Sequence, residues 1–321
     1  MRYIYAIISG SERRNFGNIG LDESPVTTVV HRDICAVVTS LEKSRIITVE
    51  DARAHERVLR SLMVEPSIIP MTFSFILEDE EQVLNLLTQG YHFFVDTLKR
   101  LENKMQVNIK ISWDKHVLNE VLLDEEVRTL VKKGKETTDD VSLKIELGKR
   151  VKESLLELEK KLLPEVLVLR ELAVGFKENH IRNDDLILNA SILIENEKHT
   201  RYIETIEELE KKFKGTLLFQ SVLPLPPYNF VDIRIERANF NEIDKARKTL
   251  DLGVSVSPTD VQTVYEKLVR LHHPDVSDDP NSMTRFNEIN HAYRILRDFT
   301  DHYSCPLTPE EVESKFLFKT K

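Results

Sequence analysis

Residues 221–231 read Ser221-Val222-Leu223-Pro224-Leu225-Pro226-Pro227-Tyr228-Asn229-Phe230-Val231. The three prolines fix the backbone φ angle and lack N–H donors, so the stretch predicts a rigid, extended connection into a following strand. Tyr228 and Phe230 supply aromatic anchors to that connection. On physical grounds the stretch is either a stiff crossover with buried aromatic rings or a docking surface, and the first interpretation is favoured.

The sequence before this stretch alternates strand-like and helix-like patterns in two blocks. In the first block, Thr48 followed by Asp51 resembles a helix capping box, and Pro70 indicates an edge strand or a bulge because proline cannot donate to a ladder. The order β-α-β-…-α-β predicts a ferredoxin-like sheet with helices on one face. The expected elements are strands at 2–8, 26–31, 34–39, 68–75 and 107–113, with helices from 48 to about 64 and at 79–103.

A charged helical segment at 115–164 separates this block from the second. Its apolar residues recur at helical spacing, which predicts either a helix packed on its own protein, the favoured interpretation, or a partner-binding or coiled-coil helix. The second, smaller α+β block spans 165–240. The apolar stripe consists of Leu147, Val151, Leu155, Leu158 and Leu162, and the second block has expected strands at 166–176, 186–194, 216–223 and 230–236 and a helix at 199–214.

Residues 244–303 differ in kind, because they show only helical periodicity, and a tail at 304–321 follows. Ser257-Pro258-Thr259-Asp260 is a strong helix start, with a Ser cap and Pro at the first helical position. Two apolar stripes of spacing 3, 4, 3 predict an antiparallel helix pair. His273-Pro274-Asp275 lies at the open end of that pair. The stripes are Val261, Val264, Leu268 and Leu271, then Phe286, Ile289, Tyr293 and Leu296.

Composition and motifs exclude several function classes. A net charge of -9 argues against nucleic acid or an anionic membrane as the main partner. No apolar run approaches the roughly 18 residues of a membrane span, and the start does not resemble a signal peptide. Cys35 and Cys305 are far apart and predict free thiols in a reducing cytoplasm. No metal-ligand cluster, phosphate-binding loop or nucleophile motif is found, so we expect no enzyme, cofactor or metal.

The proline-rich stretch resembles the Gly-Pro-Trp-Pro-Pro-Tyr-Ser/Asn-Phe-Val signature of the gas vesicle protein family GvpF/GvpL. Leu223 and Leu225 stand where glycine and tryptophan are usual, and Ser74 where glycine is common. Agreement extends over about residues 1–236, in Tyr3-Ile4-Tyr5-Ala6, His55-Glu56-Arg57-Val58-Leu59 and Ile69-Pro70-Met71-Thr72-Phe73-Ser74. The resemblance implies an accessory protein of gas vesicle formation that acts on the small, hydrophobic shell protein, with no catalytic residues.

Residues 244–303 resemble a J domain, through Leu252-Gly253-Val254, His273-Pro274-Asp275 and the run from Phe286 to Tyr293. The resemblance implies that His273, Pro274 and Asp275 contact a DnaK-type chaperone and stimulate its ATP hydrolysis. J domains usually carry a basic helix before this tripeptide, to meet an acidic partner. Here the helix has Lys267 and Arg270 against Asp260 and Glu266, a net charge of zero. The alternative is a J-like hairpin kept for packing or for binding a shell component.

The sequence therefore predicts an α+β protein of five parts: an N-terminal ferredoxin-like domain (1–114), a charged helical segment (115–164), a second ferredoxin-like α+β domain (165–240), an all-α J-domain-like hairpin (244–303) and a tail (304–321). The expected function is gas vesicle assembly in the cytoplasm, with the shell protein, other vesicle accessory proteins and a DnaK-type chaperone as partners. A general J-domain co-chaperone and a minor structural component of the vesicle are the alternatives.

Overall fold

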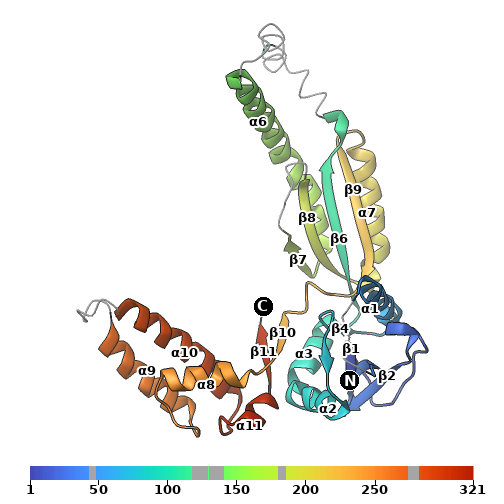
Figure 1. Cartoon of the computed structure of the whole chain (residues 1–321). Helices are drawn as coiled ribbons and strands as arrows, with labels where there is room; N and C mark the ends of the chain where they lie inside the picture. The colour runs from blue at the N-terminus through green and yellow to red at the C-terminus, as the bar shows by residue number, and fades with distance from the viewer. Residues whose placement is uncertain (43–47, 118–128, 130–140, 180–185, 274–281, 321) are drawn as a thin grey trace.

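The computed structural model describes residues 1–42, 48–117, 129, 141–179, 186–273 and 282–320. Two units built on antiparallel sheets are followed by a helical unit, and Figure 1 shows the three as separate lobes. This is the mixed α+β architecture with a C-terminal helical region that the sequence predicts.

The first sheet has the strand order β2-β3-β1-β4, and β5 also pairs with β1. Every residue from Tyr3 to Ile8 in β1 is fully buried. A strand that is apolar at successive positions needs cover on both faces, so α1 packs on one face and α2 and α3 on the other. We expected helices on one face only. The strands are β1 (Arg2–Ser9), β2 (Val26–His31), β3 (Ile34–Ser40), β4 (Ile68–Pro70) and β5 (Ile76–Leu77).

The ends of the helices in this unit are set by residues close to them in the sequence. Asp51 N–H donates to Thr48 Oγ1 at 3.3 Å and Thr48 N–H donates to Asp51 Oδ2 at 2.8 Å, which confirms the predicted capping box. The single helix expected at 79–103 is two helices that meet at Gly90, a residue of low helix propensity. Pro70 lies in the edge strand β4, as expected. The helices are η1 (Leu21–Glu23), α1 (Val49–Ser61), η2 (Leu62–Val64), α2 (Glu80–Gln89) and α3 (Tyr91–Leu101).

The second sheet has the order β7-β8-β6-β9 and carries its helices on one face. The side chains of Val107, Ile109 and Ile111 face those helices and form the core with Tyr202 and Leu209. Its elements are β6 (Lys104–Trp113), β7 (Gly175–Glu178), β8 (Leu186–Glu195), β9 (Leu217–Leu225), α6 (Val141–Val166), η3 (Leu167–Leu172), η4 (Asn196–Lys198) and α7 (His199–Lys212).

Four strand predictions differ from the structure. The strand expected at 68–75 is confined to β4, Ile68–Pro70. The strand at 107–113, expected in the first sheet, is the centre of the second, where it pairs with β8 and β9. Residues 167–172 continue α6 as a 3₁₀ helix, so the strand expected at 166–176 is confined to β7. The strand expected at 230–236 pairs with the C-terminus instead of closing the second sheet. A short apolar run does not specify its partner, which explains these errors.

α6 packs on its own protein through part of its predicted stripe. Leu155, Leu158 and Leu162 lie half-buried against the core of the second sheet, which agrees with the favoured interpretation. In Figure 1 the N-terminal half of α6 extends beyond the sheet.

The C-terminal unit contains α8 (Phe240–Thr249), α9 (Pro258–His272), α10 (Ser282–His302) and α11 (Pro309–Glu313) around one core. α8 and α11 therefore complete a unit of which only the α9–α10 pair was expected. α9 begins with the predicted capping box between Ser257 and Asp260. The expected tail is folded, because β11 (Phe316–Thr320) pairs antiparallel with β10 (Ile233–Arg237). No helix among the described residues is long and apolar enough to cross a membrane.

Candidate functional site

The proline-rich segment lies between the two sheets, where β9 ends. Pro224 is exposed within β9, whereas Pro226 and Pro227 are buried. The Leu223–Pro224 peptide bond is cis. Phe230 N–H donates to the Pro227 carbonyl at 3.0 Å, so the chain turns sharply immediately after the prolines.

The two aromatic residues of the segment enter different cores. Tyr228 packs against the core beneath α1, and burial raises the pKa of its hydroxyl to about 12. Phe230 is buried in the core beneath α2 and α3. Its ring would lie 2.9 Å from a Cβ at Gly175 in β7, so the glycine is required for this close approach. The segment thus connects both faces of the first sheet to the second sheet.

A buried polar network holds Asn229 between these two rings. Its N–H donates to Gln106 Oε1 at 2.8 Å, and its side-chain Nδ2 donates to Ser191 Oγ at 2.5 Å. Ser191 Oγ donates in turn to Asn108 Oδ1 at 3.0 Å, and Gln106 Nε2 donates to the same oxygen at 2.7 Å. Gln106 and Ser191 are almost fully buried, and buried amides are stable only when they are paired in this way.

Charged groups add a second set of contacts at the end of the segment. Arg100 of α3 donates to the Phe230 carbonyl at 2.9 Å. Asp232 pairs with Lys177 Nζ at 2.6 Å and lies 3.5 Å from Arg100. The geometry is that of a rigid junction in which Tyr228, Asn229 and Phe230 are all engaged internally. The sequence analysis did not predict the roles of Gln106, Asn108 and Ser191. The signal that could have indicated them is the presence of amide and hydroxyl side chains on one face of strands that are otherwise apolar.

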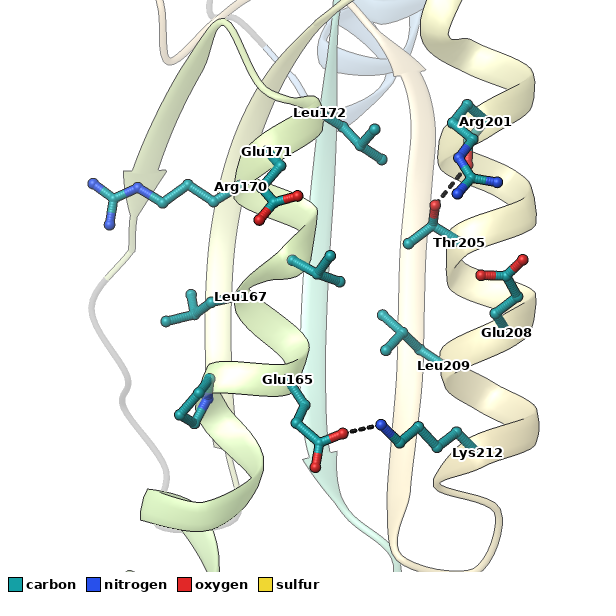
Figure 2. A pocket seen from close by; sticks show the side chains of 12 residues that line it. Glu165, Leu167, Arg170, Glu171, Leu172, Arg201, Thr205, Glu208, Leu209 and Lys212 are labelled. Carbon is teal, nitrogen blue, oxygen red and sulfur yellow. Dashed lines mark hydrogen bonds and ion pairs between the residues drawn. The ribbon is translucent and has the colours of Figure 1, made fainter.

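A groove of about 910 Å³ lies on the helical face of the second sheet. Figure 2 shows it between η3 and α7, with Leu172 and Leu209 pointing into the space between them and charged side chains at the rim. Lys212 of α7 and Glu165 form an ion pair across one end. The lining residues are Pro164, Glu165, Leu167, Val168, Arg170, Glu171, Leu172, Arg201, Thr205, Glu208, Leu209 and Lys212.

The J-like tip is formed by the C-terminal end of α9 and the beginning of α10. The rings of Tyr265 and Tyr293 stack at 3.8 Å, and the Tyr265 hydroxyl donates to Asn290 Oδ1 at 2.8 Å. His273 caps the end of α9 in an extended conformation, and its ring meets Phe286 of α10 edge-on at 5.5 Å. Pro274 and Asp275 lie outside the described residues.

The charges of α9 are separated along its length. Asp260 is held at the first turn by Ser257, whose hydrogen bonds lower the pKa of the carboxyl group. Lys267 and Arg270 are exposed on the last turns before His273. Glu266 is also exposed and accepts a hydrogen bond from Gln262 at 3.1 Å.

A family model described as gas vesicle synthesis protein GvpL/GvpF matches residues 1–232. The chain belongs to this family. The family's accessory role in gas vesicles therefore applies to it, as its sequence predicts. A second model, the DnaJ domain, matches residues 248–302, so the J-domain resemblance is also confirmed.

Individual relatives agree with both assignments. Gas vesicle protein F of Streptomyces sp. (strain CB03234) is 27% identical over 240 residues, which cover 72% of this chain and 99% of that protein. Chaperone protein DnaJ of Carboxydothermus hydrogenoformans is 48% identical over 50 residues, 15% of this chain and 13% of that protein. The crystal structure of GvpF from Anabaena sp. PCC7120 superimposes with a TM-score of 0.61 at 20% identity, covering 72% of this chain and 97% of that one. This last likeness supports the fold alone.

Proposed function

We propose that this GvpL/GvpF-family protein is a non-enzymatic, cytoplasmic assembly factor that binds the small, hydrophobic gas vesicle shell protein and recruits a DnaK-type chaperone to it. The observation that carries the proposal is that one chain joins a complete family domain to a J-like unit. A shell subunit that assembles by β-pairing exposes apolar faces and strand edges beforehand, and such surfaces aggregate. The family domain would cover these surfaces of the shell protein, and the J-like unit would bring an ATP-driven chaperone to the same client.

The arrangement of charge on α9 supports chaperone recruitment. The net charge of the helix is zero, but Asp260 lies thirteen residues before His273, roughly 20 Å along the helix axis. That distance exceeds the Debye length of about 8 Å at physiological salt, so Asp260 does not neutralise the end near His273. On the last turns of α9 itself, Lys267 and Arg270 therefore outweigh Glu266, and this excess of positive charge has the sign that an acidic partner requires.

Measuring the ATPase activity of a DnaK-type chaperone tests the proposed chaperone recruitment. The full-length protein should stimulate ATP hydrolysis, and His273→Gln should abolish the stimulation. Replacing Lys267 and Arg270 together by Ala should weaken the response and reduce its dependence on salt, whereas replacing Lys245 of α8 should not. Absence of stimulation by the parent protein would refute chaperone recruitment without touching shell-protein binding.

The groove between η3 and α7 supports shell-protein binding, because an apolar floor with a charged rim fits an amphipathic helix. Val168 lines this groove and is 37% exposed. In a pull-down from cells that express the vesicle genes, the parent should recover the shell protein. Val168→Glu should reduce that recovery several-fold, while Val64→Glu, at a position 83% exposed on η2, should not.

Two other functions predict different outcomes. A general co-chaperone would still affect many clients after deletion of residues 1–236, and loss of its gene would harm more than flotation. A structural component would remain in washed, intact vesicles, and near-absence there would exclude that role.

A further inference from the structure

Strand β9 is an open edge of the second sheet. It lies at one end of the order β7-β8-β6-β9, and within the described part of the chain no strand pairs with its outer side. The strand is nine residues long, Leu217–Leu225, and contains no ionisable side chain. Long, uncharged edges present unpaired backbone groups to other chains and are rare in proteins that stay soluble.

The edge strands β2, β4 and β7 of the two larger sheets are protected. Backbone hydrogen bonds from the segment at 14–17 cover β2, with Phe16 N–H donating to the Val26 carbonyl at 2.9 Å. β4 is three residues long and contains Pro70. β7 is four residues long and carries Lys177 and Glu178. Unlike these three edge strands, β9 is left unprotected, so we expect a strand of another chain to pair with it.

The side chains of β9 identify a partner. Leu218 and Val222 point to the face away from the helices and are 44% and 52% exposed. They lie symmetrically about Gln220, which shares that face. On the helix-facing side, Leu217 and Leu223 are likewise symmetric about residue 220. An antiparallel copy of the same strand, centred there, would place Leu218 opposite Val222.

We propose that β9 pairs antiparallel with β9 of a second copy of this chain, about a two-fold axis through Gln220. The pairing joins two four-stranded sheets into one and is isologous, the commonest form of a soluble dimer. It brings no like charges together on the strand, and it packs Leu218 of each copy beside Val222 of the other. Pro224 lacks an N–H donor and limits the pairing to the residues before it.

Single cysteines test the axis directly. Directly opposite residues in an antiparallel pair have Cα atoms about 4.5–5.5 Å apart, within the range that a disulfide spans. Gln220→Cys alone should therefore cross-link two chains on mild oxidation. Leu218→Cys alone and Val222→Cys alone should not, because each position lies roughly 13 Å from its own copy. The two together should cross-link. The parent, with only Cys35 and Cys305, is the blank.

Mass measurement is independent of this chemistry. Light scattering on the full-length protein should give twice the 37.3 kDa of one chain. Val222→Lys should give the single-chain mass, and Val64→Lys on η2 should remain a dimer. Circular dichroism checks that each variant is folded. Each of three results would overturn the proposal: a parent protein with the mass of one chain, a Val222→Lys variant that remains a dimer, or equal cross-linking at 218 and 220. If the parent has the mass of one chain, the β9 edge is instead available to an extended segment of another protein.

Discussion

His55 of α1 is buried in an aromatic cluster of the first unit. The residue is 5% exposed, and its ring lies 5.6–5.7 Å from the rings of Tyr3, Tyr5 and Phe73. The Tyr3 hydroxyl lies 2.8 Å from Nδ1. Burial lowers the pKa of His55 to about 4, even though a backbone hydrogen bond to Met71 acts in the opposite direction.

This shift predicts a loss of stability in mild acid. Because the folded-state pKa is below the unfolded value near 6.5, the unfolded chain binds a proton that the folded chain does not. The stability that comes from keeping His55 neutral is fully present above pH 6.5. It is lost as the pH falls towards 4, and the free energy of unfolding then decreases by up to about 3 kcal/mol. Urea unfolding at pH 7.5 and pH 4.5 measures it. His55→Gln should be less stable at pH 7.5 but show a smaller difference between the two pH values, whereas exposed His291→Gln should behave like the parent.

Gly175 predicts a steric effect at the junction. A Cβ there would lie 2.9 Å from Cε1 and 3.2 Å from Cδ1 of Phe230, inside normal contact. Gly175→Ala should displace that ring from the core and lower the free energy of unfolding by about 1–3 kcal/mol. At Gly148 in α6 nothing lies within 4 Å of an added Cβ, so Gly148→Ala should be neutral or stabilising. Equal thermal shifts for the two variants would contradict this account.

Sequence alone indicates neither effect. The aromatic character of Phe230 predicts that it is buried, but its contact with Gly175 joins residues 55 positions apart. His55 occurs in a run that resembles the family, yet no spacing rule shows that a neutral ring is required. Contacts of this kind depend on how elements pack, not on local pattern.

At the scale of elements, the capping boxes were the most predictable features. Thr48–Asp51 and Ser257–Asp260 both form, because the hydrogen bonds join residues three positions apart. Strand partners were less predictable, since β6 and β10 lie near their expected positions but pair in other sheets. A period of two shows which face of a strand is apolar and carries no information on its neighbour.

The cap of α9 yields a prediction at this scale. Ser257→Ala removes the oxygen that accepts from Asp260 N–H at 3.2 Å and should destabilise the helical unit by about 1 kcal/mol. Ser255→Ala, at an exposed position two residues earlier, should leave stability unchanged. Differential scanning calorimetry of the full-length variants measures both, and loss of stability in the Ser255 variant alone would contradict the assignment.

At the scale of the molecule, the C-terminal strand connects the J-like unit to the first unit. Phe316 is buried in the core beneath α2 and α3, and Phe318 packs 5.8 Å from Phe94. Gln89 of α2 accepts from Phe316 N–H at 2.9 Å and donates to the Ser314 carbonyl at 2.9 Å. The order of the units could be predicted from the sequence, but this docking could not, because the expected tail has no repeated spacing that would indicate it.

The docking predicts that β11 fixes the orientation of the J-like unit relative to the family domain. Removing residues 314–321 should leave α8, α9 and α10 folded, since the core of that unit consists mainly of their own side chains. Among the described residues, the links that remain include the chain through β10, the 3.1 Å ion pair between Arg237 and Glu78 and the hydrogen bond from the Tyr303 hydroxyl to Gln89 Oε1 at 2.9 Å. Small-angle scattering should then show a larger radius of gyration, and spin labels on α3 and α10 should report a broadened distance. Phe318→Ala should give an intermediate result. If the truncated protein stimulates the chaperone ATPase normally but delivers less shell protein to vesicles, the fixed orientation matters for transfer of the client. If its scattering and its spin-label distances match those of the parent, β11 does not set the orientation.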